Sequence, residues 1–142
     1  MNPGPEKLLN CCLNLVAVTE TWLNPSDTAS MFSDITPHGY KWYHEPQPAR
    51  RGGGVGFLVR NNLDFKVLPH VSSSSFEHVS VSIASEGSYT IDFQLVYRPP
   101  RLSKATFLED FEHFVEGSTL SHHENVILGD INFHLDITDA ST

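Results

Sequence analysis

The sequence predicts a layered α+β sandwich that is rich in strands and has one or two helices outside the sheets. Apolar and polar residues alternate with a period of two through residues 76–84 and 88–97, which is typical of strands with one face in a core. Apolar residues recur at helical spacing through residues 107–115. A chain of 142 residues has the size of one domain.

The composition excludes several classes of protein. Seventeen acidic against nine basic side chains give a net charge of −8, which argues against a general nucleic-acid coat protein. No apolar run approaches the roughly 18 residues that cross a bilayer, and residues 8–19 are a poor secretory signal. The adjacent Cys11 and Cys12 form neither a disulfide framework nor a metal-binding spacing. We therefore expect a protein of the nucleus or cytoplasm, not secreted and without a membrane partner.

The N-terminal half contains three predicted strands. Residues 13–19 (LNLVAVT) are apolar and β-branched, which favours a strand buried on both faces. Residues 54–60 (GVGFLVR) form a second strand, and the turn pair Asn61-Asn62 leads from it into a third strand at 63–67. The Pro-rich residues 46–51 are expected to form a surface loop.

Two longer strands follow, with a turn before them at residues 72–75 and a hairpin turn between them at Glu86-Gly87. Pro99-Pro100 ends the second strand, because proline cannot donate to a ladder. Ser103 is a suitable N-cap for the helix after it, and Gly117 stands where a C′ glycine would end that helix. Residues 125–130 (NVILGD) then predict a buried strand that delivers a polar turn.

Three predicted strands end in a polar residue on their apolar face, namely Glu20, Tyr97 and Asp130. If these strands are neighbours, two carboxylates and a phenol meet at one rim of the core, joined by Asn132. Carboxylate and carboxamide oxygens suit magnesium. Spacing alone leaves the alternatives open: a carboxylate after a strand is more often a turn former or helix cap, and a tyrosine before two prolines is usually a rim aromatic.

Six motifs between residues 19 and 136 follow one another in the order of a known family. They are TETWLNPSD (19–27), GYKWYH (39–44), RRGGGVGFLVRNNL (50–63), SSFEHVSVSI (74–83), VYRPP (96–100) and VILGDINFHLD (126–136). Together they resemble the endonuclease domain of LINE-type non-LTR retrotransposons, in the endonuclease/exonuclease/phosphatase superfamily. The resemblance implies the deoxyribonuclease I-like fold, a four-layer α/β sandwich with two face-to-face sheets, of which this chain is a part.

The resemblance also implies a role for each rim residue. Glu20 matches the metal-binding glutamate, and Tyr97 matches the tyrosine that contacts the scissile phosphate. Asp130 matches the aspartate that orients or deprotonates the attacking water, and Asn132 the asparagine that helps to hold the phosphate and that water. The implied activity is phosphodiester hydrolysis in DNA with Mg²⁺, or Mn²⁺ as the alternative ion.

Several basic side chains are candidates for contact with the DNA backbone. Arg98 follows Tyr97 directly and is the substrate-binding candidate, and Arg50, Arg51, Arg60 and Arg101 are close to it or to the glycine-rich strand in sequence. An equally good interpretation is that these arginines are surface charges that keep the protein soluble. His134 and Asp136 belong to the local retroelement pattern, for which turn structure is the favoured reading.

Two blocks of the family pattern are absent from the chain: an opening strand with an asparagine near the metal, and a C-terminal Ser-Asp-His triplet. The expected division is an N-terminal extension (1–12), a partial endonuclease domain (13–137) and a truncated C-terminus (138–142). Loss of a general acid or base typically lowers rates by about 10²- to 10⁴-fold. The alternative to an enzyme is therefore an inactive fragment or a binding module of the same fold. An uncovered sheet edge would also favour self-association.

Overall fold

The computed structural model describes residues 13–22, 33–45, 53–69, 73–85 and 89–133. Over these ranges the labelled elements are seven strands and a long helix. In chain order they are β1 (Leu15–Thr19), β2 (Tyr40–Glu45), β3 (Val55–Arg60), β4 (Asp64–Val67), β5 (Glu77–Ser85), β6 (Tyr89–Tyr97), α3 (Lys104–Thr119) and β7 (Glu124–Asp130). The hairpin turn expected at 86–87 and the loop expected at 46–51 lie outside these ranges.

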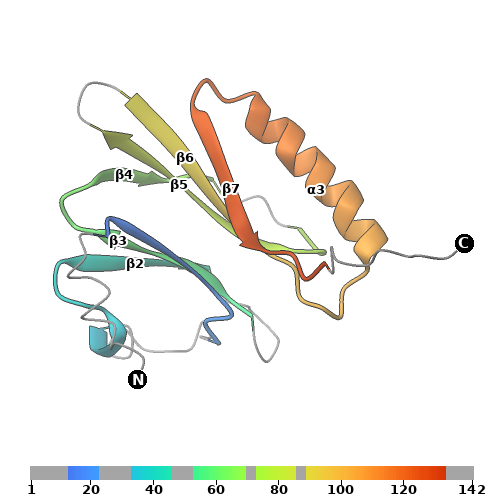
Figure 1. The fold of residues 1–142 in the computed structure, drawn as a ribbon, viewed down its shortest axis with the longest axis horizontal. Coiled ribbons are helices and arrows are strands. Elements are labelled where there is room, and N and C mark those ends of the chain that lie inside the picture. Colours follow the sequence, from blue (N-terminus) through green and yellow to red (C-terminus); the bar gives the residue numbers. More distant parts are fainter. Residues whose placement is uncertain (1–12, 23–32, 46–52, 70–72, 86–88, 134–142) are drawn as a thin grey trace, which may run out of the picture.

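The strands form two sheets that face each other (Figure 1). The first sheet has the order β1-β3-β2, and the second has the order β4-β5-β6-β7. All neighbours are antiparallel except β6 and β7, which are parallel and are joined through α3. The turn at Asn61-Asn62 carries the chain from β3 in the first sheet to β4 in the second. The predicted layered α+β sandwich is confirmed.

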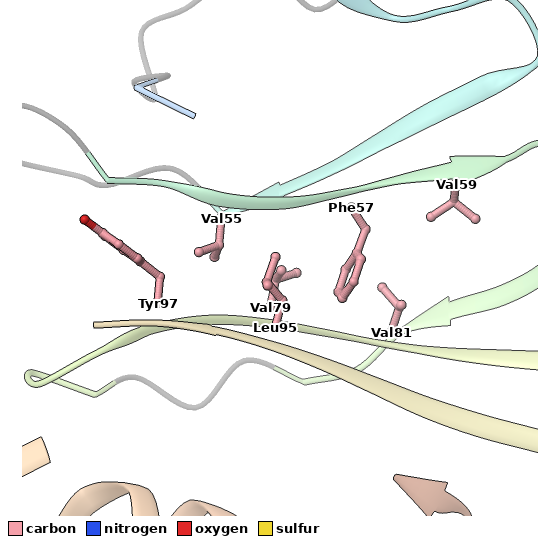
Figure 2. Close-up of a cluster of buried hydrophobic side chains, with 7 residues drawn as sticks. All are labelled: Val55, Phe57, Val59, Val79, Val81, Leu95 and Tyr97. Carbon is pink, nitrogen blue, oxygen red and sulfur yellow. The ribbon is translucent and has the colours of Figure 1, made fainter. Parts of the chain in front are cut away.

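The main core fills the space between the two sheets. Val55, Phe57 and Val59 point from β3 toward the second sheet, and each is 0% exposed. They meet the predicted apolar faces of β5 and β6 (Figure 2), whose buried members are Val79, Val81, Leu95 and Tyr97. The period-two pattern in the sequence therefore has its expected cause, because alternate side chains enter one core.

Helix α3 covers the other face of the second sheet (Figure 1). Phe107, fully buried, packs there against Phe76 and Val96. The polar residues on this face are consequently buried rather than solvated, and they hydrogen-bond to one another and to the end of α3. Gln94 donates to Ser118 and Asn125, while Asp92 accepts from Ser121 and lies 3.0 Å from a ring nitrogen of His123.

The structure confirms the predicted start of α3 but not its predicted end. The Ser103 hydroxyl accepts from the amide of Thr106, so the predicted N-cap is confirmed. The prediction that Gly117 follows the helix is wrong, because α3 continues to Thr119 and is capped by Leu120. Hydrogen bonds from the hydroxyls of Ser118 and Thr119 to carbonyls of the preceding turn accompany the extra residues.

The strands β1 and β7 are less buried than expected. Every residue of β1 is half-buried, and β7 consists of exposed and half-buried residues. Both are edge strands in the part of the chain that the structure describes. The prediction of buried strands is therefore wrong at these two positions, since an apolar composition does not reveal whether a strand has one neighbour or two. Among the described helices, none has the length and apolar character of a membrane span.

Candidate functional site

Five strand ends meet at one end of the sandwich. Pairing of Thr19 with Val55 places the end of β1 beside the start of β3. Pairing of Tyr97 with both Glu77 and Asp130 places the end of β6 between the start of β5 and the end of β7. Figure 2 shows the Tyr97 hydroxyl at the end of the core cluster, beyond Val55. We call this end of the molecule the rim.

Glu20 and Tyr97 are in direct contact at the rim, although 77 residues separate them in sequence. The Tyr97 hydroxyl donates a hydrogen bond to Oε1 of Glu20 at 3.0 Å. The backbone that carries Glu20 is in the left-handed region, with φ of 53°. It is held there by Thr21, whose amide donates to the carbonyl of Gly54, and by Trp22, whose amide donates to Gly53. The Glu20 carboxylate is exposed to solvent.

The environment of Tyr97 keeps its phenol protonated. Its side chain is 3% exposed. Burial, the hydrogen bond to Glu20 and the negative charges of Glu20, Glu77 and Asp130 raise the pKa of Tyr97 to about 12. At any pH below that value, Tyr97 is a hydrogen-bond donor and not a base. Of these carboxylates, that of Glu20 contacts the hydroxyl directly, and Glu77 and Asp130 are the residues that pair with Tyr97 in the two neighbouring strands.

Sequence reasoning missed Glu77. Its Oε1 accepts a hydrogen bond from the Gly54 amide at 3.0 Å, which ties the second sheet to the first at the rim. Glu77 shares the parity of Val79 and Val81 on the core-facing side of β5. The signal was therefore present. It was overlooked because only the C-terminal ends of strands were considered, whereas an antiparallel neighbour brings its N-terminal end to the same rim.

Asp130 and Asn132 form a tight turn after β7. The Asn132 amide donates to Oδ1 of Asp130 at 3.0 Å, and the Asn132 side-chain amide donates to the carbonyl of Arg98 at 2.6 Å. Asn132 is left-handed, with φ of 52°. Gly129 allows β6 and β7 to approach, because a Cβ on it would lie 1.7 Å from the carbonyl oxygen of Val96. The structure thus brings Glu20, Tyr97, Asp130 and Asn132 to one end of the molecule.

The position of Arg98 contradicts the expectation that it binds substrate. Its side chain is 1% exposed, and its guanidinium donates to four backbone carbonyls, those of Leu102, Ile131 and Asn132 at 2.7 Å and that of Pro99 at 3.5 Å. The direction of β6 explains this, because neighbours in a strand point to opposite faces and Tyr97 faces the first sheet. The amide of Arg60 donates to the carbonyl of Asn14, and Arg60 is the strand partner of Tyr40. Both contacts lie at the opposite end of β3 from the rim. The other candidates Arg50, Arg51, His134 and Asp136 lie outside the described residues.

The rim has the chemistry of a cation site. Glu20 and Asp130 have exposed carboxylates, and neither forms an ion pair within the described ranges. With Glu77 they give a local concentration of negative charge around Tyr97. No group of three or more His, Cys, Asp or Glu side chains in those ranges forms a metal cage. Glu20 and Asp130 are the exposed carboxylates at the rim, and a hard cation that keeps most of its waters takes one or two carboxylates.

A cavity of about 620 Å³ lies elsewhere, between α3 and the outer face of the second sheet. Its lining includes Phe76, His78, Asp92 and Phe114 but none of the rim residues. Asp92 and Gln94 on its wall are already hydrogen-bonded to neighbouring side chains. We therefore locate the candidate site at the rim, on the basis of its carboxylates and phenol.

Comparison with known proteins identifies the family of the chain. A search among curated proteins finds no match to the chain. The sequence profile of the Endonuclease/Exonuclease/phosphatase family matches residues 5–141, which is nearly the whole chain. Two facing sheets with few helices are also consistent with the deoxyribonuclease I-like fold of that family. The chain belongs to the endonuclease/exonuclease/phosphatase family, and so to a family of hydrolases of the nuclease and phosphodiesterase type.

Proposed function

We propose that this protein is a retrotransposon-derived endonuclease of the LINE type that hydrolyses phosphodiester bonds in DNA with a divalent cation. The observation that carries the proposal is the contact of Glu20 with Tyr97 at the rim where β7 delivers Asp130. The motifs ETW, VYRPP and GDIN support the retrotransposon lineage, because they occur in the order found in LINE-type endonuclease domains.

Magnesium is the ion that we propose, with manganese as the alternative. Glu20 would hold it, because its carboxylate is exposed and is oriented by the Tyr97 hydroxyl at only one of its two oxygens. When bound, the ion supplies Lewis-acid polarisation of the phosphoryl oxygen. The negative charge that surrounds Tyr97 supports this choice, since a cation at the rim would offset it.

The remaining residues act on the phosphate and on water. Tyr97 stays protonated and donates a hydrogen bond to a phosphate oxygen or to Glu20. The Asp130 carboxylate orients the attacking water and accepts its proton. The Asn132 side chain, anchored through its nitrogen to the Arg98 carbonyl, contributes its carboxamide oxygen to the same water. In-line attack forms a bond between the water oxygen and phosphorus and breaks the bond between phosphorus and the 3′ oxygen, which leaves a 5′-phosphate. The departing 3′ oxygen takes a proton from solvent, and in a retrotransposon the resulting 3′-hydroxyl can prime reverse transcription.

A supercoiled-plasmid nicking assay in Mg²⁺, Mn²⁺ or no metal tests the proposal. We expect metal-dependent nicking by the wild-type protein. Glu20→Gln and Asp130→Asn keep the shape of each side chain and should lower the rate by about 10²-fold or more. Glu109→Gln on α3 and Asp64→Asn at the start of β4 are matched controls with exposed carboxylates away from the rim, and they should nick like the wild type.

If the wild-type protein nicks the plasmid no faster than the Asp130→Asn variant does, the proposal is overturned for this chain. The alternative is then an inactive member of the family that binds DNA or another partner through the same fold. A gel-shift measurement with Ca²⁺ in place of Mg²⁺ distinguishes a DNA-binding protein from one that does not bind DNA at all.

A further inference from the structure

Arg98 is a buried cation without an acidic partner in the described residues. Among fully buried side chains it is the largest, with 1% of its surface exposed. Its Nε donates to the carbonyl of Ile131, Nη1 to that of Leu102 and Nη2 to that of Asn132, each at 2.7 Å. Burial of a charge is costly unless hydrogen bonds replace water. Here backbone carbonyls replace water: these three and that of Pro99 at 3.5 Å, of which two belong to the turn after β7.

The main chain of Arg98 binds the same turn. Its amide donates to the carbonyl of Asp130 at 2.9 Å, and its carbonyl accepts from the side chain of Asn132 at 2.6 Å. Arg98 therefore contacts Asp130, Ile131 and Asn132 through both its backbone and its guanidinium. These contacts oppose the strain of the left-handed backbone at Asn132, which is costly for a residue with a side chain.

Two aromatic rings fix the orientation of the guanidinium. The Cζ atom of Arg98 lies 5.0 Å from the ring centroid of Phe133 and 5.8 Å from that of Phe107. Phe107 is fully buried and comes from α3, whereas Phe133 directly follows the turn. A planar group with several donors fits this arrangement, and the ammonium of lysine does not reproduce it.

We infer that Arg98 is a positioning residue, whose buried guanidinium fixes the 130–132 turn and so holds Asp130 and Asn132 at the rim beside Tyr97. Its consequence for catalysis rests on the proposed function. The ordering of the turn by Arg98 is independent of the proposed function, because it can be measured on a protein that does not cleave DNA.

The test compares Arg98→Lys with the wild type by residue-resolved amide hydrogen exchange. The amides of residues 98 and 132 both donate to Asp130, and we expect them to exchange at least about tenfold faster in the variant. The amide of Val81, in the central strand β5, should not change. Arg60→Lys is the matched control, because Arg60 also lies over an aromatic ring, that of Tyr40, but at the far end of β3.

The activity readout separates positioning from substrate binding. Arg98→Lys should lower kcat by about 10²-fold, since small misplacements of catalytic groups have effects of this size. Its KM should stay within about twofold of the wild type, because Arg98 does not reach solvent. If the wild-type protein does not nick DNA, the proposed function fails while the exchange measurement still decides the role of Arg98.

Unchanged exchange at residues 98 and 132 in a folded Arg98→Lys variant would overturn the inference. If that variant does not fold, Arg98→Ala is measured in methylguanidinium and in methylammonium. The inference is supported if methylguanidinium, but not methylammonium, restores the fold and slow hydrogen exchange of the amide of residue 132. Equal effects of the two cations, or no restoration by either, contradict it.

Discussion

Tyr97 is the residue whose acid–base behaviour the fold changes most clearly. The phenol of an unfolded chain titrates near pH 10, whereas burial and the carboxylates at the rim raise the pKa of Tyr97 to about 12. We therefore expect a tyrosinate transition near pH 12 in the absorbance difference between the wild type and Tyr97→Phe. Its contribution to stability should be complete below pH 10 and should be lost as the pH rises from 10 through 12.

The contribution of Glu20 to this shift can be measured separately. Glu20→Gln removes one negative charge and the hydrogen bond to a carboxylate, so the pKa of Tyr97 should fall toward 10. Burial is unchanged in that variant and should keep the pKa above 10. Titration of Tyr97 near pH 10 in the wild type would contradict the geometry of the rim.

Residue parity correctly placed Tyr97 and Asp130 together, because they pair on the core-facing side of β6 and β7. Parity was wrong for β1, where Leu15 and Ala17 face the core instead of Val16 and Val18. Glu20 reaches the rim because its left-handed backbone, with φ of 53°, ends the period of two. The same rule applied to both ends of a strand identifies Glu77. Arg98 was assigned wrongly, since an arginine that binds carbonyls and one that binds phosphates look alike in sequence. Only the three-dimensional position distinguishes them.

Two glycines, one in β7 and one in α3, should respond in opposite ways to substitution by alanine. Gly129 has φ of 148°, and its added Cβ would overlap the backbone of Val96 in the neighbouring strand. Gly129→Ala should therefore cost about 3 kcal/mol or more and separate β6 from β7. Gly117 lies inside α3, where an added Cβ meets nothing within 4 Å. Gly117→Ala should stabilise the protein by about 0.5–1 kcal/mol.

Urea denaturation of the two variants checks both values. Because the two substitutions add the same methyl group, each serves as the control for the other. A stable, native Gly129→Ala protein would show that β6 and β7 are not paired as described.

The types of the elements were predictable, but their exposure was not. Alternation located β5 and β6, and helical periodicity located α3, because each pattern is local. The partner of an edge strand is a long-range property, so the sequence of β7 reads as buried although Val126 is 41% exposed. For the same reason Gly117 was mistaken for a helix end, since Ser118, the next residue of the helix, hydrogen-bonds to Gln94 of β6, a contact that the local sequence does not reveal.

The two sheets of the sandwich do not match in width. The second sheet has four strands and the first has three. Residues Val126 and Leu128 of β7 face the same side as Phe93 and Leu95 of β6, but the first sheet covers them incompletely. The outer edge of β7 has no strand partner among the described residues. An apolar surface and an unpaired edge therefore occur on the same strand.

This combination favours association of two copies, because an open edge offers unpaired amides and carbonyls to another strand. We expect gel filtration with light scattering to show a mass above 15.9 kDa that rises with protein concentration. Val126→Lys places a charge on the exposed apolar side of β7 and should restore the monomer. Leu108→Lys is the matched control, since Leu108 is 55% exposed on α3, and it should associate like the wild type. A wild-type monomer at every concentration would mean that the edge of β7 is protected in solution.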